Sequence, residues 1–212
     1  MAGATREGLE CEIRDKHEQG QYAAAAALVI RGYGAELFGF LLAFHRDEED
    51  AAEVFAEFSE RLVRALPAFR GGSSFRTWAY ALARHASLNY RRGARRRDKR
   101  QMPLPDGSEH PAVVELTRDE TPAYLRTDRR ARFTALRESL PREDQELLVL
   151  RVDRGLSWND LALVRHDGAS ALTDEALKRE AMRLRQRFHL LKKRLSALAR
   201  DAGVLDDRPE GG

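Results

Sequence analysis

The chain has 212 residues, of which 33% are charged and 42% hydrophobic, and its formal net charge is +3. This length suits one large domain or two small ones. No uninterrupted apolar run approaches the roughly 18–20 residues that cross a bilayer. The N-terminus lacks the basic start and cleavage site of a secretory signal. The single cysteine, Cys11, excludes an internal disulfide framework. We therefore expect a cytoplasmic protein that does not contact a membrane.

Helical periodicity begins near the N-terminus and predicts helices over residues 9–18 and 21–45. Gly32 and Gly34 weaken the second helix, because glycine is a poor helix former. The first helix could cap the domain or serve regulation, and we prefer the capping role.

The next predicted helix starts at Asp47, as N-cap, and closes at Pro67. Its apolar positions recur every three or four residues, and acids lie on the opposite face. The acids are Asp50, Glu53, Glu57 and Glu60. Solvation is the usual explanation of such a face, but a basic protein partner would also explain it.

A turn and a basic helix follow in the string "FRGGSSFRTW" (69–78). Ser73 or Ser74 can cap the helix. The glycine-serine turn is small and polar, so it could let the backbone approach a base extruded from a DNA duplex. Phe75 and Trp78 are neighbours of basic residues in the sequence. Aromatic rings beside basic side chains are suited to stacking on unpaired nucleotides. The alternative is that both rings belong to the core.

Charge is unevenly distributed along the chain. Residues 47–60 contain acids and no base, whereas 61–100 contain one acid, Asp98, among many arginines. A second basic block covers 178–200 and contains only Glu180 as an acid. Two separated basic blocks predict two contacts with a polyanion.

The stretch 101–126 is rich in proline at its start, so we expect a linker there. Helices are predicted to resume near 127 and at Pro141, to stop at Gly155, and to restart at Ser157 in a capping box with Asp160. Thr173 is expected to cap a long last helix. This order is that of a helix-turn-helix module.

The last helix repeats apolar residues in a heptad rhythm, and its basic residues lie largely off that seam. A dimerising coiled coil would show this rhythm. A helix packed on its own domain with a basic face outward would show it too, and we favour this second interpretation. Neither metal-ligand spacing nor a phosphate loop occurs. We expect no enzyme activity, no metal and no cofactor.

Two longer strings now carry a family resemblance. "ALPAFRGGSSFRTWAYALARHA" (65–86) resembles region 2 of sigma-70 family RNA polymerase sigma factors of the extracytoplasmic-function group. "LPREDQELLVLRVDRGLSWNDLALV" (140–164) resembles the start of region 4 in that group. The resemblance implies an all-α chain with a region 2-like domain at 1–100, a linker at 101–126 and a region 4-like helix-turn-helix domain at 127–205.

The resemblance also implies partners and site residues. The −10 promoter element would be read by the turn and the helix after it, at Arg70, Gly71, Gly72, Ser73, Ser74, Phe75, Arg76, Trp78, Arg84, Asn89, Arg91 and Arg92. The −35 element would be read by Lys178, Arg179, Arg183, Arg185, Gln186, Arg187 and His189. Core polymerase would bind Asp50, Glu53, Glu57 and Glu60 through the clamp of its largest subunit, and the flap of the second subunit would bind the second domain. An anti-sigma factor is a further candidate partner.

Two alternatives to a sigma factor stay open on sequence. A stand-alone helix-turn-helix regulator would bind duplex DNA without polymerase, but it leaves the acidic helix unexplained. An adaptor that binds polymerase and not promoter DNA leaves the two basic blocks unexplained. One departure from the family pattern is the long stretch 165–181 before the basic helix, which predicts either an N-terminally extended helix or a longer loop.

Overall fold

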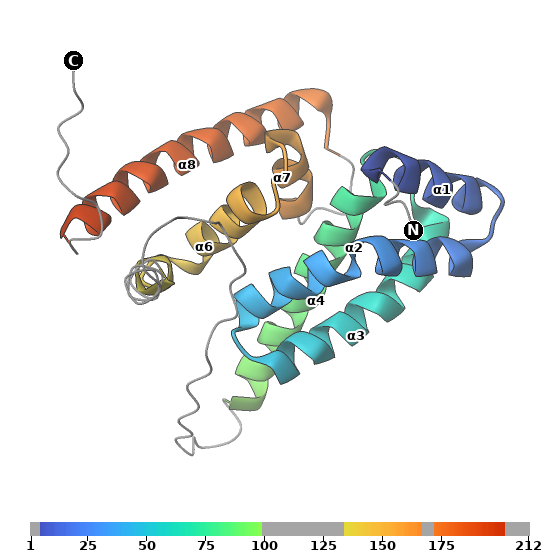
Figure 1. The fold of residues 1–212 in the computed structure, drawn as a ribbon, viewed down its shortest axis with the longest axis horizontal. Coiled ribbons are helices and arrows are strands. Elements are labelled where there is room, and N and C mark those ends of the chain that lie inside the picture. The colour runs from blue at the N-terminus through green and yellow to red at the C-terminus, as the bar shows by residue number, and fades with distance from the viewer. Residues whose placement is uncertain (1–4, 99–133, 167–171, 202–212) are drawn as a thin grey trace, which may run out of the picture.

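A computed structural model describes residues 5–98, 134–166 and 172–201 of the chain (Figure 1). Its N-terminal bundle, which we define as residues 5–98, consists of four helices. They are α1 (Arg6–Glu18), α2 (Tyr22–His45), α3 (Glu48–Ala65) and α4 (Phe75–Asp98), with a short 3₁₀ turn, η1 (Leu66–Ala68), after α3. No strand occurs among the described residues, so the all-α prediction is confirmed there.

The C-terminal unit, defined as the described residues from 134 onward, is also helical. It contains a helical turn at 134–138, then α6 (Arg142–Leu148), the π-helical turn η2 (Val149–Asp153), α7 (Trp158–Arg165) and α8 (Asp174–Asp201). Gly155 takes a positive φ of 66° and so lets the chain turn sharply between η2 and α7. The predicted capping box forms, with Ser157 and Asp160 each bonded to the other's backbone.

Local sequence rules explain most helix boundaries. Asp47 caps α3 by accepting a hydrogen bond from the Asp50 amide at 2.8 Å. The Ala176 amide donates to Thr173 Oγ1 at 3.3 Å, so α8 starts where the sequence predicted it. Helix α8 begins at Asp174, before the basic block, so it is extended at its N-terminus, and residues 166–173 connect it to α7. Residues 167–171 and the predicted linker lie outside the described residues.

The structure starts the first helix earlier than predicted and confirms the predicted second helix. Helix α1 begins at Arg6 and not at residue 9, because Thr5 caps it. Helix α2 continues through Gly32 and Gly34, and packing is the reason. A Cβ at Gly32 would lie 2.2 Å from Leu9 Cδ2, so glycine allows α1 to pack closely on α2.

Helix α2 is long and apolar enough to cross a membrane by length and composition alone. Here it is the central helix of the bundle and packs against α1, α3 and α4. Its residues Leu37, Phe40 and Leu41 are buried. This packing is that of a helix in the core of a bundle.

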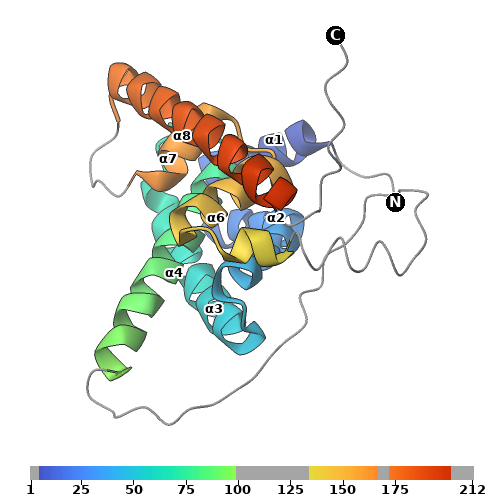
Figure 2. The same ribbon diagram turned by 90° about the vertical axis from the view of Figure 1, so that its left-hand side faces the viewer.

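The buried apolar residues form one continuous cluster that runs from Ile13 in α1 to Leu191 in α8. Helices α6, α7 and α8 lie together on one side of the bundle, over α2 and α4 (Figures 1 and 2). The C-terminal unit is therefore packed on the N-terminal bundle in this structure. The proposed domain limits at 1–100, 101–126 and 127–205 stay a prediction.

Candidate nucleic-acid and polymerase interfaces

The glycine-serine turn is an exposed corner before α4. Gly71 has a positive φ of 74°, and a Cβ at Gly71 or Gly72 would meet nothing within 4 Å. Ser74 caps α4, because its Oγ accepts the Thr77 amide at 3.0 Å. Ser73 is half-buried and its Oγ donates to the Ser74 carbonyl. The corner thus offers backbone to an incoming ligand with little side-chain obstruction.

A second cap of α4 comes from the far N-terminus. The Glu10 carboxylate accepts hydrogen bonds from the Phe75 amide at 2.9 Å and the Arg76 amide at 3.0 Å. It also accepts from the Tyr33 hydroxyl at 2.7 Å. A carboxylate at a helix N-terminus is favoured by the helix dipole. The contacts of Glu10 with the α4 amides therefore support the capping role that we preferred for the first helix.

The aromatic rings near the turn pack against one another at tilted angles. Phe69 lies 4.4 Å from the Phe75 ring and 5.0 Å from the Trp78 ring, centroid to centroid. Phe75 is only 2% exposed, whereas Trp78 and Phe69 are half-buried at the edge of the cluster. In this arrangement Phe75 is a core residue, and Trp78 and Phe69 are the rings with surface left for a ligand.

Two arginines assigned to the −10 element are buried in ion pairs. Arg76 is 6% exposed and binds the Glu36 carboxylate through two hydrogen bonds of 2.6 and 2.9 Å. Arg84 is 7% exposed and donates to Glu146 Oε1 at 2.5 Å. Glu146 belongs to α6, so the C-terminal unit covers Arg84. Neither guanidinium can reach DNA in this arrangement.

The remaining residues of the −10 set divide by exposure. Arg70 is exposed and donates to the Pro67 carbonyl at 3.2 Å. Asn89 and Arg92 are exposed near the other end of α4, where Arg92 donates to the Asn89 side chain at 3.4 Å. Arg91 is half-buried with its guanidinium 5.4 Å from the Phe44 ring centroid. The accessible −10 residues therefore sit at the two ends of α4.

The outer face of α3 is acidic, as predicted. Glu53 and Glu60 are exposed, and the exposed Val63 continues the same face. Glu57 is half-buried and lies 3.9 Å from the Arg61 guanidinium. Asp50 differs from the other three acids, because it accepts a hydrogen bond from the Tyr90 hydroxyl at 2.5 Å and so ties α3 to α4.

His45 is the last residue of α2 and lies beside the Tyr90–Asp50 hydrogen bond. Its Nε2 lies 2.7 Å from Ser87 Oγ, and its Nδ1 lies 3.9 Å from Asp50 Oδ2. Burial lowers the pKa of His45 from its ordinary value, although the Asp50 charge opposes the change. The imidazole is therefore held neutral near pH 7 within the α2–α3–α4 junction.

Helix α8 packs its apolar seam on its own unit. Leu184 and Leu191 are buried, and the Phe188 ring lies 5.5 Å from the Trp158 ring of α7. The intramolecular interpretation of the heptad rhythm is therefore confirmed for these residues. The assigned −35 residues that are exposed are Lys178, Arg179, Arg183, Arg185, Gln186 and His189.

Arg187 is the exception among the −35 residues. It donates to Asp144 Oδ1 at 2.6 Å and to Glu143 Oε2 at 2.7 Å, so it fixes α8 to α6. The hydrogen bond and charge of Arg187 lower the pKa of Glu143. Arg183 is also paired, with Glu180 at 3.1 Å, but on the open surface.

Sequence reasoning missed the acids that meet the arginines of α4. Glu10, Glu36 and Glu146 come from three other helices and are distant from α4 in sequence, and no local pattern marks Glu10 or Glu36. A charged residue at an otherwise apolar helical position is the one available signal, and Glu146 before Leu147 and Leu148 shows it. No group of three or more metal-ligating side chains occurs within the described ranges.

Comparison with known proteins agrees with this geometry. Residues 29–97, which include α3, most of α2 and nearly all of α4, match the family model described as sigma-70 region 2. The chain is 30% identical to the RNA polymerase sigma-H factor of Pseudomonas aeruginosa over 157 residues, which are 72% of this chain and 80% of that protein. The chain belongs to the sigma-70 family of RNA polymerase sigma factors.

Two further relatives point to the same group. The RNA polymerase sigma factor YlaC of Bacillus subtilis is 28% identical over 137 residues, covering 63% of this chain and 75% of that protein. The ECF RNA polymerase sigma-E factor of Haemophilus influenzae is 30% identical over 152 residues, covering 70% and 79%. The protein is thus a sigma factor of the extracytoplasmic-function type and not a stand-alone regulator. Its partners are core RNA polymerase and promoter DNA.

Proposed function

We propose that three surfaces of this sigma factor each bind a different partner during transcription initiation. The turn at 70–74 and α4 bind the −10 element, the exposed face of α8 binds the −35 element, and the outer face of α3 binds the clamp of core polymerase. The observation that carries this assignment is the separation of charge: two basic surfaces and one acidic surface lie on different helices of one chain.

The −10 surface works by capturing a base and not by gripping the backbone alone. The open corner at Gly71 and Gly72 admits an extruded base, and Trp78 offers a partly exposed ring beside it. Stacking one base is worth about 1–3 kcal/mol, which offsets an extrusion cost of a few kcal/mol. Asn89 and Arg92 hold the strand farther along α4. Phe75 supports the ring cluster from the core.

Polymerase has to supply the rest of the opening free energy. Separating duplex DNA costs about 1.4 kcal/mol per base step, so about ten steps cost roughly 14 kcal/mol. That cost exceeds the binding free energy that contacts with one turn and one aromatic ring can supply. This free-energy comparison fits a cytoplasmic subunit that binds and positions promoter DNA on polymerase and does not itself catalyse a reaction.

The α8 surface suits major-groove reading. Arg185 and Gln186 are exposed, and such side chains make bidentate hydrogen bonds to guanine and adenine edges. Arg187 is committed to α6, so its contribution is to set the angle of α8. The flap of the second polymerase subunit is the proposed partner of the C-terminal unit, and an anti-sigma factor is a further proposed partner.

Substitution in the turn tests the assignment. Gly71→Val together with Ser74→Ala should change the relative use of −10 variants in run-off transcription by at least about 10-fold, while core affinity changes less than twofold. Arg64→Ala, on the exposed end of α3, serves as the control. Unchanged preference among −10 variants would remove the base-capture assignment.

A further inference from the structure

Helix α1 lies outside residues 29–97, the part of the chain that matches the family model. It nevertheless contacts the segments on both sides of the corner, residues 70–74. At the tip of the corner, a Cβ at Gly71 or Gly72 would meet nothing within 4 Å, so the tip has little packing of its own. The position of the corner therefore depends on the two segments that flank it, η1 before it and the first turn of α4 after it.

The segment after the corner is held by Glu10 of α1. One carboxylate oxygen, Oε2, accepts a hydrogen bond from the Phe75 amide at 2.9 Å, and Oε1 accepts one from the Arg76 amide at 3.0 Å. The Tyr33 hydroxyl of α2 donates to Oε1 at 2.7 Å and ties the carboxylate to α2 as well. Both oxygens bind the first amides of α4, so Glu10 fixes the point at which that helix leaves the corner.

The segment before the corner is held by His17, near the other end of α1. Its Nε2 lies 2.9 Å from the Leu66 carbonyl oxygen, and because a carbonyl can only accept, Nε2 carries the proton. The same carbonyl accepts the Phe69 amide at 3.0 Å, which closes η1. The His17 ring also packs edge-on against the Phe69 and Phe75 rings, with centroids 5.7 Å apart in both pairs. His17 thus fixes the last turn before the corner.

The spacing of these two residues lets one helix face reach both sides of the corner. Glu10 and His17 are seven residues apart, which is close to two helical turns and about 10 Å along the axis. Between them Ile13 is fully buried. Leu9 seats α1 closely on α2, since a Cβ at Gly32 would lie 2.2 Å from Leu9 Cδ2. Helix α1 is therefore a firmly packed element with a polar contact near each end.

Other elements hydrogen-bond to the α4 side of the corner. Arg76 donates to Glu36 of α2 at 2.6 and 2.9 Å, and Thr77 donates to Asp160 of α7 at 2.8 Å. These contacts hold the first turn of α4 but do not involve η1. Contacts with both η1 and α4 are what suit α1 to set the distance across the corner.

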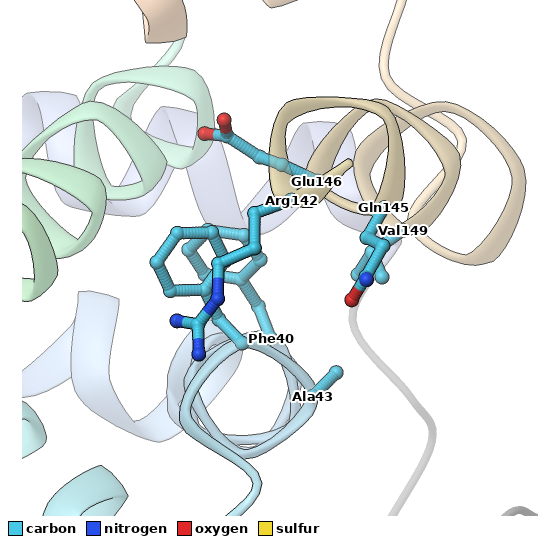
Figure 3. Close-up of a pocket in the computed structure, with 7 residues that line it drawn as sticks. Phe40, Ala43, Arg142, Gln145, Glu146 and Val149 are labelled. Atoms are coloured by element: carbon cyan, nitrogen blue, oxygen red, sulfur yellow. The ribbon is translucent and has the colours of Figure 1, made fainter. Parts of the chain in front are cut away.

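The crevice between α2 and α6 lies farther from the corner. Phe40 and Ala43 of α2 line it opposite Arg142 of α6 (Figure 3). Phe40 comes seven residues after Tyr33, so it lies about 10 Å farther along α2 than the contact with Glu10. This crevice belongs to a different contact and gives the corner no direct support.

We propose that α1 is a specificity element for the −10 promoter element, in which Glu10 and His17 are positioning residues that hold the two sides of the corner at the spacing a captured base needs. This inference rests on the proposed base-capture function of the corner. Neither side chain has to touch DNA. Loss of either one leaves the corner in place but lets its width vary, so the corner discriminates less between −10 bases.

Competitive run-off transcription with core polymerase and the full chain tests this role. Two templates that differ at one −10 base compete for the same holoenzyme, so the ratio of their transcripts does not depend on the folded fraction of the chain. Glu10→Gln and His17→Leu should each reduce this ratio about 5-fold, an effect of the size of one hydrogen bond. Glu12→Gln and Arg14→Leu are the matched controls, because both residues are exposed on the same helix, and they should keep the wild-type ratio.

Conservative and double variants distinguish positioning from general stability. His17→Gln keeps a donor for the Leu66 carbonyl and should recover most of the preference, whereas His17→Phe keeps a ring without that donor and should not. Because Glu10 and His17 hold the same corner, the variant that combines Glu10→Gln with His17→Leu should lose about as much as either single variant, and not the roughly 25-fold product expected of independent sites.

The outcomes separate this inference from the proposed function. Wild-type ratios in Glu10→Gln and His17→Leu, or equal losses in the two controls, would overturn the role of α1 and leave base capture intact. A 25-fold loss in the double variant, or equal behaviour of His17→Gln and His17→Phe, would overturn the joint positioning through these hydrogen bonds. A wild-type holoenzyme that uses all −10 variants equally would overturn the base-capture function itself.

Discussion

Replacing Glu10 by alanine should destabilise the protein by about 2–4 kcal/mol, because one carboxylate serves three donors. The Phe75 amide, the Arg76 amide and the Tyr33 hydroxyl all donate to it. Loss of a helix cap costs about 1 kcal/mol, and loss of a charge favourable to the helix dipole costs about 0.3–1 kcal/mol. The Tyr33 hydroxyl adds about 1–2 kcal/mol, since a partly buried donor loses its partner. Ser74 still caps α4, which keeps the total from being larger.

Urea unfolding followed by circular dichroism measures this change, and thermal unfolding gives a second value. For a chain of this size 1 kcal/mol corresponds to about 2–4 °C, so a loss of 3 kcal/mol lowers Tm by roughly 6–12 °C. Glu12→Ala is the matched control, because Glu12 is an exposed acid on the same helix. If Glu10→Ala and Glu12→Ala unfold within 0.5 kcal/mol of each other, the carboxylate does not tie α1 to α4 and the reasoning is wrong.

Three further predictions concern charge. Reversal of Glu53 and Glu57 to lysine should weaken core polymerase binding at least about 10-fold with an unchanged helical spectrum, and unaltered pull-down would refute the clamp assignment. Arg179→Ala should flatten the log–log salt dependence of −35 binding by about 0.9 if it contacts one phosphate, whereas Arg200→Ala should not, and equal slopes would exclude that contact. Because burial lowers the pKa of His45, the unfolded chain binds more protons than the folded chain just below pH 6.5, so stability should fall as pH drops through that range, by at most about 1.4 kcal/mol per pH unit. His45→Gln should remove that part of the pH dependence, and a profile identical to wild type would show that His45 does not titrate with unfolding.

Local signals in the sequence predicted the helices well. Asp47, Ser74, Ser157 and Thr173 cap the helices that they were expected to cap, because a cap depends on residues three positions apart. Gly32 could not be explained by a local signal, because its role is to allow close contact with Leu9 of another helix. The π-helical turn after α6 had no sequence signal that we recognised.

The surfaces could be predicted only in part. The exposed faces of α3 and α8 follow from periodicity, because acids and bases alternate with a buried apolar stripe. The burial of Arg76 and Arg84 could not be foreseen, because it depends on Glu36 and Glu146, which are distant in sequence. Packing between the N-terminal bundle and the C-terminal unit is a tertiary property, and a linker in the sequence gives no information about it.

Run-off transcription tests the account most directly. Purified core polymerase, with and without the full chain, would transcribe a library of genomic fragments, and the start sites would be mapped. We predict transcripts that need the chain, start at shared positions, and are lost when either of two upstream elements about 25 base pairs apart is changed. Transcripts that do not depend on the chain, together with tight binding to duplex DNA in the absence of core polymerase, would contradict its role as a promoter-specificity subunit.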